Sequence, residues 1–286
     1  MAIPISRLSD PSSLAACVSL QREILGERAR TVWAVPALTA VTESGGWVLA
    51  AGAEDAGSSR LHGTLVDLVA EADGYPARYT AFRAVSRDAR GCGVAQALRH
   101  AERTLCQRAG VDLAFWAIDP LRSVEAHLAM NKLGAIATQY RRDLFGETPD
   151  DVNLGLATDR LLIEWWIDAP RVVAILDRGS PPPHFRLGIH EMDVFTRTHL
   201  SANGVRMLVG HEDDPTGEHV LVEVPADLDR IRALDLVAAR EWRVKSREVF
   251  ELLFASGYVG TGFIHEGGRS FHLFRRADRR TVLRDA

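Results

Sequence analysis

Two long stretches of the chain place apolar residues three and four positions apart, with polar residues between them. The first covers residues 11–27 and follows Asp10, while Pro11 occupies its first turn, which favours a helix start. The second covers residues 94–109 and precedes Gly110, a residue type that commonly ends a helix in the left-handed conformation. Both stretches predict amphipathic helices that bury one face.

Shorter runs rich in β-branched and aromatic residues predict strands. We expect strands at residues 3–8, 47–49, 60–71, 78–86, 113–118, 135–143, 160–168, 205–209, 219–224, 258–265 and 270–275. Residues 123–133 predict a short helix, and residues 226–256 predict a long helix or a helix pair. Together these elements predict an α+β fold.

Polar and proline-rich segments predict the loops and a domain boundary. Residues 55–59 predict a hairpin loop, and residues 145–159 form a long loop of the kind that often carries function. The segment that ends at Pro170 predicts a boundary, and the prolines of residues 181–183 interrupt the chain beyond it. We therefore expect one domain at residues 1–169 and a second at residues 170–286.

Composition and charge narrow the function. A net charge of −4 argues against a dedicated nucleic-acid binder, and no apolar run approaches the ~18 residues of a membrane span. The first ten residues contain no basic region followed by an apolar stretch, so no secretory signal is visible. Cys17, Cys92 and Cys106 form no metal-ligand pattern and no even disulfide set, which favours a reduced, cytoplasmic protein without a metal.

A glycine-rich turn precedes the helix predicted at residues 94–109. The turn and the helix start comprise Arg90, Gly91, Cys92, Gly93, Val94 and Ala95. Glycine allows the backbone to approach a ligand closely, and the N–H groups at a helix start carry the positive end of the helix dipole. Such a turn forms an anion site suited to a pyrophosphate.

Two cofactors can use such a turn. In a dinucleotide site, Gly91 and Gly93 would bind the pyrophosphate, and Asp119 at the end of the next strand would bind the ribose. Against this alternative, residues 86–90, three of which are charged, separate the turn from its strand, and the third glycine of that motif is absent. The second alternative, a turn for coenzyme A, rests on a family resemblance.

Arg90, Gly93 and Ala95 match the pattern Arg/Gln-x-x-Gly-x-Gly/Ala, and the turn resembles the acyl-CoA loop of the GNAT superfamily of N-acyltransferases. The order of predicted elements around the turn is also that of this superfamily. Further segments are similar to one bacterial branch with an extra C-terminal region, and they comprise residues 20–21, 35–36, 45–48, 119–121, 131–135, 153–161, 164–165, 241–243, 247–250 and 257–258. Some members of that branch transfer succinyl from succinyl-CoA to amino acids.

The resemblance implies a GNAT-type mixed β-sheet flanked by helices, followed by a C-terminal α+β region. It implies acetyl-CoA or succinyl-CoA as co-substrate, an amine such as an amino acid as acceptor, and the backbone N–H near Val85 as oxyanion donor. The alternative is a non-catalytic protein that binds acyl-CoA or interacts with a partner through a degenerate site. Neither nucleic acid nor a membrane is expected as a partner, and a homodimer is left open.

Candidate substrate residues lie after the strand at 113–118 and in or beside the long loop. They are Asp119, Asn153, Thr158, Asp159 and Arg160. Arg160 can bind a substrate carboxylate bidentately, and the alternatives are a turn role for Asp119 and a loop that caps itself.

The residues that would transfer protons are not recognisable. Many GNAT enzymes place an Asn early in the helix after the fifth strand, and a Tyr that acts as general acid one turn before the glycine that ends this helix. Counted back from Gly134, those positions hold Ser123 and Met130. Methionine cannot donate a proton, so the catalytic residues stay unassigned.

The second half of the sequence weakly repeats the order of the first. In each half, a helix ends at a glycine, Gly134 or Gly257, and two predicted strands follow. Between the strand at 219–224 and the following helix there is no glycine to admit a phosphate. We expect a degenerate GNAT-like half that binds no CoA and lines the acceptor side with Glu241, Arg243 and Arg247, or else an unrelated α+β cap.

Overall fold

The computed structural model describes residues 3–27, 29–52, 60–153, 155–179, 192–202 and 204–285. The chain forms two compact units: Met1–Trp116 with Thr148–Leu154, and Ala117–Glu147 with Gly155–Ala286. This division falls inside a strand, Leu113–Ile118, whereas the expected domain boundary at residue 169 stays a prediction. The expected loop at 55–59 and the prolines 181–183 lie outside the described residues.

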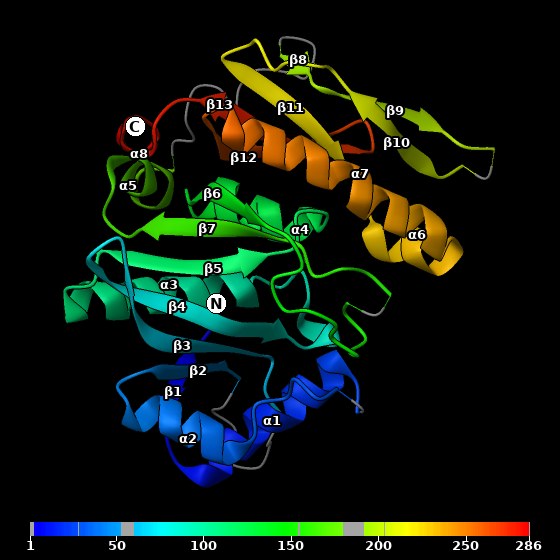
Figure 1. Cartoon of the computed structure of the whole chain (residues 1–286). Helices are drawn as coiled ribbons and strands as arrows, with labels where there is room; N and C mark the ends of the chain where they lie inside the picture. Colours follow the sequence, from blue (N-terminus) through cyan, green and yellow to red (C-terminus); the bar gives the residue numbers. More distant parts are fainter. Residues whose placement is uncertain are drawn as a thin grey trace. The chain divides into compact units, whose positions relative to one another are not determined.

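The first unit contains a sheet with the strand order β1-β2-β3-β4-β5 and helices beside it (Figure 1). Its elements are β1 (Ile5–Leu8), α1 (Pro11–Leu25), α2 (Val35–Glu43), β2 (Trp47–Ala51), β3 (Gly63–Ala72), β4 (Tyr75–Val85), the short 3₁₀ helix η1 (Arg87–Ala89), α3 (Val94–Ala109) and β5 (Leu113–Ile118). Neighbours from β1 to β4 are antiparallel. Strand β5 is parallel to β4, with Ala77 to Tyr79 opposite Leu113 to Phe115.

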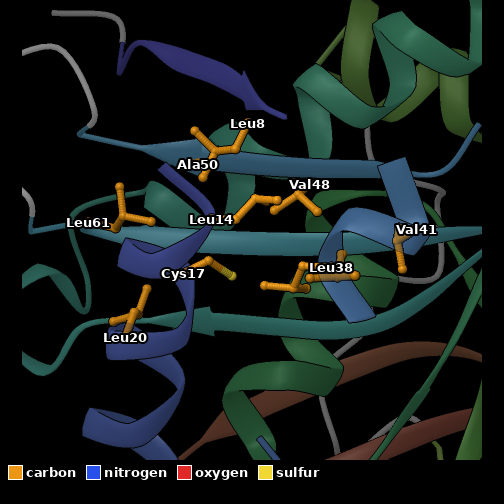
Figure 2. Close-up of a cluster of buried hydrophobic side chains, with 10 residues drawn as sticks. Leu8, Leu14, Cys17, Leu20, Leu38, Val41, Val48, Ala50 and Leu61 are labelled. Carbon is orange, nitrogen blue, oxygen red and sulfur yellow. The ribbon is translucent and has the colours of Figure 1, made fainter. Parts of the chain in front are cut away.

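Helices α1 and α2 bury their apolar faces on this sheet (Figure 2). The buried cluster consists of Leu8, Leu14, Cys17, Leu20, Leu38, Val41, Val48, Ala50, Leu61 and Val66. Helix α1 begins as expected, because the carboxylate of Asp10 accepts the backbone N–H groups of Ser12 and Ser13 at 3.1 and 3.0 Å.

The start of α3 lies directly against β3. A Cβ atom at Gly63 would meet Val94 Cγ1 at 2.6 Å and Leu98 Cδ1 at 3.2 Å, so only glycine fits at this crossing. The helix ends at Ala109, and Gly110 follows with φ +64°, as the sequence predicts. This contact fixes where the glycine-rich turn leaves the sheet.

A buried polar network joins α3 to the strands. Arg99 Nη1 donates to Thr80 Oγ1 and to Glu102 Oε2, both at 2.7 Å, and its guanidinium lies 3.6 Å from the Trp116 ring centroid. Asp67 is fully buried nearby, and among the described residues no donor reaches either carboxylate oxygen. Burial and the Glu102 carboxylate together raise the pKa of Asp67 well above its usual range, which favours its neutral form.

The second unit contains a sheet with the order β7-β6-β12-β13-β11-β8 and a separate β9-β10 pair. Its elements are α4 (Ser123–Ala126), the π-helix η2 (His127–Lys132), β6 (Ile136–Arg141), β7 (Arg160–Trp166), α5 (Pro170–Asp177), β8 (Asp193–Val194), β9 (Thr196–Leu200), β10 (Arg206–His211), β11 (His219–Val224), α6 (Leu228–Leu234), α7 (Leu236–Ala255), β12 (Tyr258–Glu266), β13 (Arg269–Arg276) and α8 (Arg279–Arg284). Strand β8 is parallel to β11, and the other described pairs are antiparallel. Helix α7 packs on β6, β11 and β12 (Figure 1).

The expected repeat of helix, glycine, strand and strand is confirmed within this unit. Gly134 and Gly257 follow their helices with φ +73° and +80°, and the antiparallel pairs β6–β7 and β12–β13 come next. Both pairs shift register at the fourth residue after the glycine, Thr138 in one and Thr261 in the other. A short helix, α5 or α8, then follows each pair.

The α+β class with a mixed sheet flanked by helices is confirmed, but several elements were not predicted. They are α2, α5, α8, β8 and β9. The helix expected at 123–133 changes from an α-helix to a π-helix at His127. Pro170, which the sequence suggests as a boundary, occupies the first turn of α5, where a missing N–H costs nothing.

Candidate functional site

The glycine-rich turn lies between the end of β4 and the start of α3, as the sequence predicts. Strand β4 ends at Val85, and η1 leads into Gly91 and Gly93, whose φ angles are +78° and +85°. A Cβ atom would have room at both positions, with nothing nearer than Ile3 Cδ1 at 4.0 Å. The left-handed backbone, rather than lack of space, therefore requires glycine here.

The start of α3 is open to an anion. Gly93 occupies the N-cap position, no side chain caps the helix, and its first turn contains no acidic residue. The N–H groups of Val94, Ala95 and Gln96 consequently have no intrahelical acceptor. Arg90 and Cys92 are exposed at the same turn. Six of the seven residues predicted to bind the cofactor lie in the turn and the helix start, and the seventh, Val85, ends β4 before them.

A second polar cluster lies in the other unit, where β5 ends. Asp119 accepts the Leu121 N–H at 2.9 Å and Arg243 Nη2 at 2.6 Å, and Arg122 Nε lies 3.9 Å from it. Burial alone would raise the pKa of Asp119, but the charge and hydrogen bond of Arg243 outweigh burial and lower that pKa to about 2. Asp119 is therefore ionised, and it is a poor proton acceptor at neutral pH.

Asp159 is the other carboxylate of this cluster. It accepts Arg247 Nε and Nη2 at 2.9 Å each, Tyr140 Oη at 2.5 Å and the Asp143 N–H at 2.9 Å. Burial opposes ionisation, but the hydrogen bonds from Arg247 and Tyr140 lower the pKa of Asp159. Burial, followed by Asp159, raises the pKa of Tyr140, so the phenol stays protonated.

Arg160 completes the cluster. Its side chain is 7% exposed, Nη1 donates to the Asp159 carbonyl at 2.9 Å, and its guanidinium lies 5.2 Å from the Phe145 ring centroid. The structure thus brings together three of the predicted substrate residues: Asp119, Asp159 and Arg160. The cluster combines acidic and basic side chains. Both of its carboxylates, Asp119 and Asp159, already accept hydrogen bonds from arginines.

Thr158 and Asn153 are engaged within the long loop. Thr158 Oγ1 lies 3.0 Å from both Asp143 Oδ1 and the Gly146 carbonyl, and it accepts the Phe145 N–H. Asn153 belongs to the first unit, where its backbone and side-chain N–H groups donate to Asp150 at 2.8 to 3.1 Å. These contacts are those of a loop that caps itself.

The two positions expected to hold an Asn and a Tyr are occupied by residues with other contacts. Ser123 Oγ donates to the Pro225 carbonyl at 2.7 Å, and Met130 is fully buried in η2. The general acid therefore stays unassigned.

Sequence reasoning did not select Tyr140 as a site residue, and it placed Arg243 and Arg247 only generally near the acceptor. The two arginines are four positions apart, so they lie on one face of α7. Helix α7 also buries Trp242 and Phe250. Arginines that lie among such apolar residues indicate ion pairs inside the protein.

Among the described residues, no group of three His, Cys, Asp or Glu side chains is arranged to hold a metal ion. No helix in the described part of the chain is long and apolar enough to cross a membrane.

No family model matches the chain, and no curated protein matches it. Among solved structures, the ribosomal-protein-S18-alanine N-acetyltransferase from Escherichia coli is 14% identical, with a TM-score of 0.43 over 57% of this chain and 93% of that one. A ribosomal-protein-alanine N-acetyltransferase from Brucella melitensis is 16% identical, with a TM-score of 0.44 over 57% and 98%. An acetyltransferase of the GNAT family from Streptococcus pneumoniae is 12% identical, with a TM-score of 0.44 over 57% and 97%.

Replacing Asp119→Asn should destabilise the fold by about 3 kcal/mol at pH 7, because it leaves the buried Arg243 guanidinium without a counter-charge. Asp119 stabilises the fold when ionised, so this contribution is present above its unfolded pKa near 4 and falls as pH approaches 2. Urea unfolding at pH 7 and pH 3 should therefore show a smaller difference from wild type at pH 3.

Asp229→Asn provides the control, since Asp229 pairs with Arg122 at an exposed position. We expect a change within about 1 kcal/mol there. An equal effect of the two substitutions, or a difference that does not shrink at pH 3, would contradict the role given to the Asp119–Arg243 pair.

Proposed function

We propose that the protein transfers an acyl group from coenzyme A to an amine. The observation that carries this proposal is the uncapped start of α3 behind two left-handed glycines. Three N–H groups without an intrahelical acceptor and the positive end of a 16-residue helix suit a pyrophosphate. The match of Arg90, Gly93 and Ala95 to the acyl-CoA loop pattern favours CoA over a dinucleotide.

In the proposed reaction, the amine nitrogen attacks the thioester carbonyl carbon, and the carbon–sulfur bond of the tetrahedral intermediate then breaks. The product is an amide, and the CoA thiolate takes up a proton. The backbone N–H near Val85 would stabilise the oxyanion, as the resemblance implies. No described residue is assigned as the base or as the acid.

The C-terminal half is proposed to be a degenerate GNAT-like half that binds no CoA. Pro225 to Leu228 replaces the glycine-rich turn there. The carboxylates of Asp227 and Asp235 cap α6 and α7 by accepting the N–H groups of Arg230 and Ala238, both at 2.9 Å. An acidic cap occupies the donors that a phosphate needs and repels its charge.

A non-catalytic acyl-CoA-binding protein is the second candidate. It is favoured by the buried Met130 at the position where the general acid is expected, since methionine supplies no proton. Release of free thiol from acyl-CoA in the presence of amines separates the two candidates.

Coenzyme A or acetyl-CoA should stabilise the protein by about 2.7 kcal/mol at a hundredfold excess over Kd. Gly93→Val should abolish the corresponding rise in melting temperature, because valine does not adopt the left-handed backbone that directs the α3 N–H groups. Gly74→Val is the matched control, since Gly74 has φ +79° in a turn between β3 and β4. A melting shift with NAD and none with any CoA species would overturn the proposal.

The acyl group is proposed to be succinyl and the acceptor a hydrophobic amino acid, on the branch resemblance and on the arginines Arg83, Arg87 and Arg160. Succinyl-CoA with leucine should therefore release thiol faster than acetyl-CoA with spermidine, as measured by thiol titration. Equal rates, or faster release with spermidine, would contradict this assignment.

A further inference from the structure

Strand β3 packs against helix α3 and places an acidic residue on the face that the helix covers. Gly63 marks this face, because a Cβ atom there would meet Val94 and Leu98 of the helix. Side chains alternate along a strand, so Asp67, four residues further on, points to the same face. Asp67 lies opposite Thr80 of β4 and is fully buried. A carboxyl group therefore lies between the strands and α3, out of contact with water.

The hydrogen-bond donors beside Asp67 are used by another carboxylate. Thr80 donates its one hydroxyl hydrogen to Glu102 Oε1 at 3.1 Å, and Arg99 Nη1 donates to Glu102 Oε2 at 2.7 Å. Arg99 Nη1 also donates to Thr80 Oγ1. Among the described residues, no donor reaches either oxygen of Asp67. An ionised Asp67 would consequently be a buried charge without a hydrogen bond, which costs free energy.

A proton on Asp67 removes this cost, because a protonated carboxyl group is itself a donor. Burial first and the charge of Glu102 second raise the pKa of Asp67, whereas the charge of Arg99 and contact with Thr80 lower it less. Hydrogen bonding between the Asp67 and Glu102 carboxyl groups adds to the rise in the pKa of Asp67.

The other groups around Asp67 do not supply the missing hydrogen bond. From β4, Arg78 attracts Asp67 by its charge, but its Nη1 donates to the Gly45 carbonyl at 2.8 Å. From α3, Cys106 is a neutral thiol because burial raises its pKa. From β2, the residue opposite Asp67 is Trp47, which does not ionise. The charge state of Asp67 is therefore decided by its two charged partners on α3.

We propose that Asp67 and Glu102 share one proton in the folded protein, and that this proton makes the attachment of α3 to the sheet sensitive to pH. With the proton present, the Asp67 hydroxyl donates to a Glu102 oxygen, and Arg99 balances the one remaining negative charge. Without it, two carboxylates face each other in a buried setting, where their repulsion is stronger than in water. The same helix begins at the turn proposed for coenzyme A, but the shared proton does not depend on which cofactor binds there.

The folded protein thus holds a proton that the unfolded chain releases. An aspartate in the unfolded chain has a pKa of about 3.9, and the pKa of Asp67 in the folded protein lies well above its usual range. The contribution of the shared proton to stability is therefore complete below about pH 4, and it decreases as pH rises through the folded pKa of Asp67. This dependence is opposite to that of Asp119, whose pKa is lowered by Arg243.

Urea unfolding of the full chain between pH 5 and pH 10 tests the proposal with Asp67→Asn. The asparagine amide can donate to Glu102 but does not titrate, so the variant keeps the hydrogen bond and loses the pH sensitivity. The folding equilibrium constant of the wild type, divided by that of the variant, should fall about tenfold per pH unit until pH reaches the folded pKa of Asp67. A ratio that does not change with pH would overturn the proposal.

Asp112→Asn is the matched control, because Asp112 is an exposed aspartate directly before β5. The wild type and this variant should differ by no more than about twofold in the folding equilibrium constant over the whole pH range. A fall with pH equal to that seen with Asp67→Asn would count against a special role of Asp67 and would also overturn the proposal.

Two measurements on the folded wild type serve if Asp67→Asn does not fold. The infrared spectrum at pH 6 should contain the carbonyl stretch of a protonated carboxylic acid, and this band should disappear as pH rises. Hydrogen exchange of the α3 N–H groups, corrected for its chemical dependence on pH, should become faster over the same pH range. Absence of the band at pH 6, or exchange in α3 that does not respond to its loss, would contradict the shared proton or its effect on α3.

Discussion

The buried ion pair between Asp119 and Arg243 is the interaction on which the second unit depends most. It joins the end of β5 to α7 across 124 positions of sequence, through a 2.6 Å hydrogen bond. One turn further along α7, Arg247 donates two hydrogen bonds to the carboxylate of Asp159. Arg243 and Arg247 therefore connect the helix to two loops. A well-packed apolar pair would stabilise such a junction as well, so stability alone does not require charged residues here.

The helix ends could be predicted because their causes are local. Asp10 caps α1 with its own carboxylate, and Gly110, Gly134 and Gly257 adopt left-handed backbone where the sequence predicts helix ends. Helix α2 was missed because four of its nine residues, Val35, Thr39, Val41 and Thr42, are β-branched. Packing of two of its side chains in the buried cluster compensates for that weak propensity.

The candidate site was only partly predictable. Asp119, Asp159 and Arg160 could be selected because they lie at a strand end and at the end of a long loop, where functional residues are common. Their partners Arg243 and Arg247 are 124 and 88 positions away from the carboxylates they bind. No local pattern encodes such pairings, because they arise only when α7 packs on its sheet.

The repeat in the second unit connects fold and function. A left-handed glycine precedes both strand pairs, and each pair shifts register at the fourth residue after that glycine. The helix starts differ: α3 has no side-chain cap, whereas aspartate side chains cap α6 and α7. On the proposed function, the start of α3 would bind the cofactor, and the acid-capped starts of α6 and α7 would not.

A crystal structure of the full chain with coenzyme A tests the central claim most directly. The account predicts electron density for the pyrophosphate against the backbone N–H groups of Val94, Ala95 and Gln96 at the start of α3. A pyrophosphate bound at α6 or α7, or anywhere other than the start of α3, would contradict it.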